Sequence, residues 1–152
     1  MKTRNFLDKT FGPVGTSAGI LLFVVGLFTS FTSLFGLILL VPGAFVGFTF
    51  NSCVIDWQKK RVKFTTNLFG IIRTGKWVNI EPDMKIGIKK SNQVWRAYSR
   101  SNRTLDIEKS DFRIILYDRN NRQIMPVKKV KTPEEASHEG ITLGDRLGLK
   151  FN

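Results

Sequence analysis

The strongest constraint on this chain is a long segment without a charged side chain. From residue 10 to residue 55 there is no Asp, Glu, Lys or Arg, a run of about 46 residues, whereas a soluble domain rarely goes half that far without one. As one continuous helix the run would extend about 69 Å, roughly twice the ~30 Å hydrocarbon core of a bilayer. The sequence therefore predicts two membrane crossings in its N-terminal third.

Hydroxyl residues at positions 30, 32 and 33 divide this run, so we expect helices over residues 14–29 and 34–50 joined by a short turn. A cleaved signal peptide is the alternative, because residues 1–4 form a basic start before an apolar stretch. The weak small-residue cleavage pattern near the turn and the second apolar segment that follows at once argue against it. A two-helix transmembrane hairpin over residues 14–50 is the favoured interpretation.

Basic residues flank this hairpin on both sides, while the turn between its helices carries no charge. Lys2, Arg4 and Lys9 precede it, and a cluster from Lys59 to Lys63 follows it. The positive-inside rule then places both termini in the cytoplasm, with residues 1–13 as a basic N-terminal segment. A single cysteine, Cys53, excludes an intramolecular disulfide and suits a reducing compartment; we expect a buried thiol.

Small residues repeat at helical spacing within both apolar segments. Glycines let helix backbones approach closely in lipid, so we expect packing between the two helices, with docking of other subunits as the alternative. The glycines concerned are Gly15, Gly19, Gly26, Gly43 and Gly47.

After residue 51 the apolar pattern alternates with a period of two, which is typical of β-strands. We expect strands over residues 53–57, 62–68, 71–80 with a break at Gly75, 84–89, 112–117 and 123–130. Residues 91–111 fit either short strands or a loop. Thr132, Pro133 and Glu135 form the start of a capped helix over residues 133–149, whose apolar face we expect to cap a barrel.

Six or seven short antiparallel strands followed by one capped amphipathic helix resemble pleckstrin-homology-like domains. The segments that carry the resemblance to small two-pass bacterial membrane proteins with such a domain are Val54-Ile55-Asp56-Trp57-Gln58-Lys59-Lys60-Arg61-Val62-Lys63, Leu68-Phe69-Gly70-Ile71, Gly75-Lys76-Trp77 and the closing stretch from Thr132 to Leu149. The resemblance implies an α+β membrane protein of the bacterial inner membrane. Residues 51–152 would form a cytoplasmic β-barrel or sandwich with an interaction role and no shared catalytic residues.

Catalysis finds little support in the sequence. The one histidine, His138, falls on the polar side of the predicted helix, and no metal-ligand spacing, phosphate loop or nucleophile motif occurs. We therefore expect a protein that is not an enzyme and holds no metal or cofactor. The net charge of +12 favours anionic partners; membrane lipids and a protein partner are expected, and nucleic acid or a small-molecule ligand is not.

Two sets of residues are candidates for these contacts. The predicted lipid contacts are Leu68, Phe69, Lys89 and Lys90, with simple solvated charges as the alternative for the two lysines. The predicted partner surface comprises Lys59, Lys60, Arg61, Lys63, Trp95, Arg96, Tyr98, Arg100 and Arg103. For its second half the alternative is an ordinary strand with buried aromatics.

Three functions fit these features. The leading hypothesis is a non-enzymatic inner-membrane accessory or adaptor subunit that binds proteins through its β domain. The second is a ligand-gated membrane effector whose barrel binds an anionic ligand such as a cyclic nucleotide, and the third is an anionic-lipid sensor.

Overall fold

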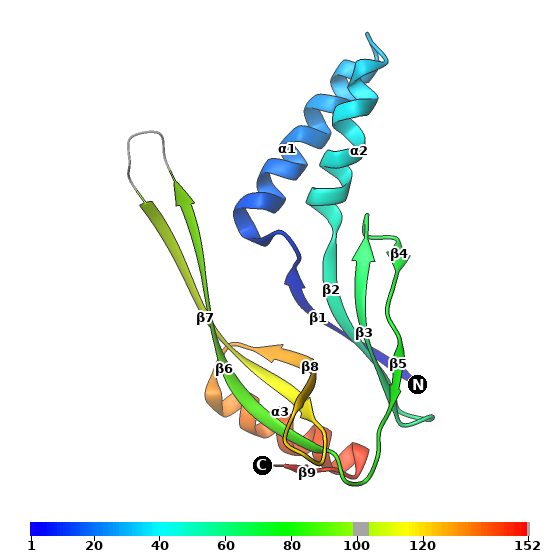
Figure 1. Cartoon of the computed structure of the whole chain (residues 1–152), viewed down its shortest axis with the longest axis vertical. Coiled ribbons are helices and arrows are strands. Elements are labelled where there is room, and N and C mark those ends of the chain that lie inside the picture. Colours follow the sequence, from blue (N-terminus) through cyan, green and yellow to red (C-terminus); the bar gives the residue numbers. More distant parts are fainter. Residues whose placement is uncertain (99–103, 152) are drawn as a thin grey trace.

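A computed structural model describes residues 1–98 and 104–151, with the backbone alone for 93–98 and 104–109. Within these residues the chain is α+β, with three helices and two open sheets. Two helices project together from one end of the sheets, and the third covers the opposite end (Figure 1).

The projecting helices are α1 (Gly12–Ser30) and α2 (Phe35–Phe48), which lie side by side with their connecting turn farthest from the sheets (Figure 1). Their bounds differ by one or two residues from those predicted. α1 is long and apolar enough to cross a membrane, whereas α2 is shorter at 14 residues. Large apolar side chains cover their outer surface, among them Leu21, Phe28, Phe35 and Ile38. The helices therefore bury small residues and expose large apolar ones, the reverse of a water-soluble helix.

The N-terminal segment, for which the sequence predicted basic character but no secondary structure, forms a strand. Residues Lys2–Lys9 form strand β1, which pairs antiparallel with β2 (Phe50–Asp56). Alternation explains the strand, because Leu7 points into the core and is buried while Arg4 and Phe6 are exposed. The predicted boundary at residue 51 is therefore wrong: the β domain takes its first strand from before the helices.

The first sheet has the strand order β1-β2-β3-β4, and β5 also pairs with β3. β3 spans Arg61–Leu68, β4 Ile72–Arg73 and β5 Trp77–Asn79. The predicted break at Gly75 is confirmed. Its φ is 121°, and a side chain there would collide with the Phe64 carbonyl oxygen.

The second sheet has the order β8-β7-β6-β9. β6 (Lys85–Tyr98) and β7 (Thr104–Tyr117) are 14 residues each, while β8 spans Gln123–Val130 and β9 Lys150–Phe151. The long β6–β7 ribbon extends past β8 on the side of the helical pair (Figure 1). The stretch 91–111, left open by the sequence, is thus mostly a continuation of these two strands.

The core lies between the two sheets and α3 (Pro133–Leu147), and includes Ile55, Val62, Ile86 and Leu116. The predicted closed barrel is wrong, because both sheets are open. β1 and β8 approach each other, but side chains join them: the Asn5 side chain donates to the Val127 carbonyl oxygen at 3.1 Å, and Lys129 donates to Asp8. Local alternation predicts strands, but it does not determine which edges will pair.

α3 matches the prediction closely. The Thr132 side chain accepts a hydrogen bond from the Glu135 amide at 3.2 Å, and Pro133 occupies the first turn. The buried residues of the helix are Ala136, Gly140, Leu143, Gly144 and Leu147, which form its apolar face. The helix ends at Leu147 rather than residue 149, because Gly148 adopts a left-handed conformation with φ 73°.

Candidate functional site

The outer face of the first sheet presents cations around one indole ring. Trp77 in β5 lies opposite Lys63 in β3, and its side chain is 36% exposed. The Arg61 guanidinium carbon lies 4.3 Å from the ring centroid, and the ammonium nitrogens of Lys2 and Lys63 lie 5.8 and 6.0 Å from it. These distances are those of cation–π contacts. We call Lys2, Arg4, Arg61, Lys63 and Trp77 the Trp77 face.

Asp56 holds Arg61 in position beneath the ring. The Asp56 carboxylate oxygen lies 3.3 Å from Arg61 Nε, and Asp56 is only 3% exposed. Burial disfavours the charged carboxylate, but hydrogen bonds from the Lys59 amide and Arg61, with the charges of Arg61 and Lys2, hold its pKa below the ordinary value. Asp56 therefore stays ionised and orients the guanidinium that stacks on Trp77.

A buried polar network fixes Arg4 farther along the same face. Arg4 donates to Asn67 Oδ1 and to Ser52 Oγ, and Asn67 Nδ2 in turn donates to Ser52 Oγ at 2.9 Å. The Arg4 guanidinium carbon also lies 5.2 Å from the centroid of the Phe50 ring. Because Ser52 and Asn67 are fully buried, Arg4 is tied to the sheet rather than free in solvent, which lowers the entropy cost of using it in binding.

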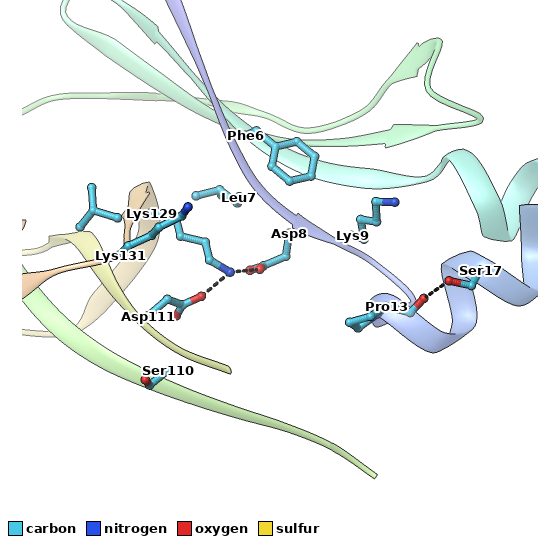
Figure 2. Close-up of a pocket in the computed structure, with 12 residues that line it drawn as sticks. Phe6, Leu7, Asp8, Lys9, Pro13, Ser17, Ser110, Asp111, Lys129 and Lys131 are labelled. Atoms are coloured by element: carbon cyan, nitrogen blue, oxygen red, sulfur yellow. Dashed lines mark hydrogen bonds and ion pairs between the residues drawn. The ribbon is translucent and has the colours of Figure 1, made fainter. Parts of the chain in front are cut away.

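A second site is a cleft of about 740 Å³ where α1 meets the two sheets. Figure 2 shows Lys129 pointing at both Asp8 and Asp111 there. The Lys129 ammonium lies 2.6 Å from Asp8, and Arg113 Nη2 lies 2.7 Å from the second oxygen of Asp8. Arg113 Nε also contacts Asp111 at 3.4 Å. We call these four side chains the seam cluster.

The seam cluster joins the edge of one sheet to the edge of the other. Asp8 comes from β1, whereas Asp111 and Arg113 come from β7 and Lys129 from β8. Two acids and two bases balance one another, and all four side chains are mostly buried. The cluster therefore fastens β1 to the second sheet; its charges are already engaged with each other.

The predicted helix-packing glycines lie mostly between α1 and α2. An added Cβ at Gly19 would collide with Gly47 and Val46, one at Gly26 with Leu40, and one at Gly43 with Phe23. An added Cβ at Gly47 would come within 3.0 Å of Ile20 in α1. One at Gly15 would instead meet Phe11, the residue just before its own helix. Four of the five glycines thus serve the contact between the two helices.

The predicted lipid contacts lie in two separate places. Leu68 and Phe69 are half-buried at the end of β3, where the Phe69 ring packs on Phe45 of α2. Lys89 and Lys90 are exposed but occupy the middle of β6, opposite Arg113 and Phe112 in β7. The structure therefore does not bring the apolar pair and the lysine pair together.

The predicted partner surface divides in the same way. Arg61 and Lys63 lie on the Trp77 face, and Lys59 and Lys60 are exposed in the adjoining β2–β3 turn. Trp95, Arg96 and Tyr98 lie in β6, for which the backbone alone is described there. Arg100 and Arg103 lie outside the described residues.

Sequence reasoning missed Lys2, Arg4 and Trp77 as members of this surface. The available signal was the alternation of residues 2–9, which places Lys2 and Arg4 on one side of a strand.

The described part of the chain offers no site for metal binding, and its one cysteine is buried. Residues 1–98 and 104–151 hold no cluster of three His, Cys, Asp or Glu side chains that could bind a metal ion. His138 is exposed on α3. Burial raises the pKa of the Cys53 thiol to about 12 despite a hydrogen bond from the Lys63 backbone, so Cys53 remains a protonated core residue.

Comparisons with known proteins return no relative. No family model matches the chain, and neither a curated protein nor a solved structure gives a significant match. The functional argument therefore depends on the geometry described above.

Proposed function

We propose that the protein is a non-enzymatic, two-pass adaptor of the bacterial inner membrane that recognises an acidic protein segment through the Trp77 face. The main support for this proposal is the group of cations around Trp77, three of which lie within 6.0 Å of the centroid of one exposed ring. Such a surface offers charge and a rigid aromatic plane together, the composition of binding hot spots.

The path of the chain supports the two-pass arrangement. β1 leads into α1, α2 leads into β2, and β1 pairs with β2 from Lys2 opposite Asp56 to Lys9 opposite Phe50. Two helices rooted in neighbouring strands must leave the membrane on the same side if both cross it. The flanking lysines and arginines assign that side to the cytoplasm.

We favour an adaptor over a ligand-gated effector because Lys129, the mostly buried cation of the cleft, is already paired with Asp8 and Asp111. A small anionic ligand would have to compete with Asp8 and Asp111 for Lys129.

The proposal is tested by purifying the full chain in mild detergent and comparing which proteins accompany three versions of it. Lys2→Glu with Lys63→Glu reverses two charges of the Trp77 face, and Lys89→Glu with Lys90→Glu reverses two exposed charges of the second sheet as the matched control. We expect the face variant, but not the control, to lose a partner that the natural sequence retains. Recovery of the same proteins by both variants would exclude the Trp77 face as the binding surface.

A further inference from the structure

The turn between β3 and β4 lies against the last turn of α2. The Phe69 ring contacts the Phe45 ring with centroids 5.4 Å apart, and the Phe69 amide donates to Thr49 Oγ1 at 3.3 Å. Phe45 precedes the end of α2 by three residues, or about 4.5 Å of helix. The turn therefore extends beyond the start of β2 and overlaps the helical pair (Figure 1).

The exposed side chains at this turn are apolar. Ile71 is 80% exposed and Ile72 is 55% exposed, in a position where turns usually carry polar residues. We call Phe69, Gly70, Ile71 and Ile72 the isoleucine tip. Its apolar surface continues onto the helices through a groove of about 380 Å³, which is lined by Phe6, Ile20, Phe48, Phe69 and Ile71.

A cation stands at each edge of the sheet immediately below the tip. Across the sheet Lys9 lies opposite Phe50, Phe50 opposite Asn67, and Asn67 opposite Arg73. Lys9 and Arg73 are both exposed. The order along the molecule is thus apolar helices, apolar tip and then a row that ends in positive charges, which matches the order of acyl chains and phosphates in a bilayer.

We propose that the isoleucine tip enters the bilayer interface while Lys9 and Arg73 contact the phosphates of anionic phospholipids. This inference rests on the proposed membrane anchoring of α1 and α2. A lipid surface is the occupant because the tip continues the apolar surface of those helices and the cations complement anionic headgroups. The tip is thereby a third attachment point, separate from both membrane helices.

This attachment fixes how the Trp77 face is presented. Trp77 lies opposite Lys63, four residues along β3 from the Asn67 row, which is about 13 Å at 3.3 Å per residue. That distance exceeds the ~8 Å Debye length at physiological salt. Arg4 reaches Asn67 in that row, but Trp77 and the cations around its ring are held near the membrane and beyond the reach of the headgroup charge. They therefore stay available to an acidic partner.

The experiment places a polarity-sensitive fluorophore on single introduced cysteines of the full chain in nanodiscs of phosphatidylcholine and phosphatidylglycerol. Ile71→Cys reports the tip, Leu21→Cys the outer surface of α1, and Lys59→Cys the distant β2–β3 turn. The native Cys53 is 0% exposed and remains unlabelled. We expect blue-shifted emission at position 71, with stronger quenching by lipids labelled near the headgroup than by lipids labelled deep in the chain.

The three sites separate this inference from the proposed function. Quenching at position 21 combined with water-like emission at position 71 would overturn membrane insertion of the tip and leave the anchor intact. Water-like emission at both positions would overturn the anchor itself. Emission at position 71 that is water-like in nanodiscs but shielded in native membranes would assign the tip to a protein and overturn the lipid contact.

A charge variant tests the second half of the inference. In the Ile71→Cys background, Lys9→Glu with Arg73→Glu should reduce headgroup-level quenching in anionic nanodiscs but not in purely zwitterionic ones. Lys89→Glu with Lys90→Glu is the matched control and should change neither. Equal loss in both lipids, or no loss in either, would overturn the role of Lys9 and Arg73.

Discussion

The Trp77 face and the seam cluster use the same kinds of residue in opposite ways. On the Trp77 face the cations surround an aromatic ring, and Asp56 pairs with one of them. In the seam cluster two cations meet two acids, and each base contacts both of them. Basic residues alone therefore indicate no function in this chain. The acids beside them distinguish the proposed binding surface from a structural tie.

The largest expected effect comes from removing the shared acid of the seam cluster. Asp8→Ala leaves Arg113 and Lys129 with Asp111 as their remaining partner from the cluster, in a mostly buried seam. We expect a loss of about 2–3 kcal/mol in the free energy of unfolding, below the full ~3–5 kcal/mol for a buried pair because the side chains are partly exposed. Denaturant unfolding in detergent measures it. The exposed Asp83→Ala is the control and should change stability by less than about 0.5 kcal/mol.

A matched pair of lysines tests the comparison directly. Lys129→Met keeps much of the buried stem but removes the charge that bridges Asp8 and Asp111, and we expect a cost of about 1–2 kcal/mol. Lys63→Met on the Trp77 face should cost less than about 0.5 kcal/mol, while it weakens partner binding. Equal destabilisation by the two changes would mean that the Trp77 face is also a structural tie.

Acid should weaken the Trp77 face through Asp56. Its folded-state pKa lies below the ordinary value, so its stabilising contribution is complete above the usual aspartate pKa of about 3.9 and is lost as the pH falls through the folded pKa. An NMR titration of the Arg61 side chain should follow that loss. Asp56→Asn should abolish the transition, and Asp83→Asn should leave it unchanged; persistence without Asp56 would assign the transition to another group.

The smallest expected effect on stability is at Lys2. The Lys2 ammonium lies over the Trp77 ring, 5.8 Å from its centroid, and Lys2 is exposed. Lys2→Gln should therefore change the free energy of unfolding by less than about 0.5 kcal/mol. Partner binding, measured by titration of an acidic peptide onto the full chain in nanodiscs, should nevertheless weaken and lose part of its salt dependence. Unchanged salt dependence would remove Lys2 from the binding surface.

Local patterns predicted the elements whose stabilising interactions lie close in sequence. The start of α3 is an example, because Thr132 and Glu135 are one helical turn apart. β1 was missed because its partner is 54 residues away, with Lys2 opposite Asp56, and only Leu7 on its inner side is strongly apolar. The length of β6 was missed because Lys89, Lys90 and Ser91 interrupt the apolar alternation.

The candidate sites show the same limit. The β2–β3 turn and the basic half of β3 were predicted from contiguous residues, whereas the Trp77 face and seam cluster are each assembled from distant strands. Closed-barrel topology could not be excluded in advance, since edge pairing depends on the whole sheet. Counter-charges are likewise invisible in sequence: Asp8 and Lys129 are separated by 121 positions yet form an ion pair.

The pairing of β1 with β2 has a consequence for how the chain is made. Translation delivers β1 first, but its partner emerges only after both helices have left the ribosome, so β1 can pair with β2 only after the whole helical segment has been made. The helical pair thus acts as the loop that closes a β-hairpin; under the proposed membrane anchoring, the first sheet is completed only after both helices have inserted. A bulky fusion at Met1 would hinder this late pairing of β1 with β2, whereas the same fusion after α3 would not affect it.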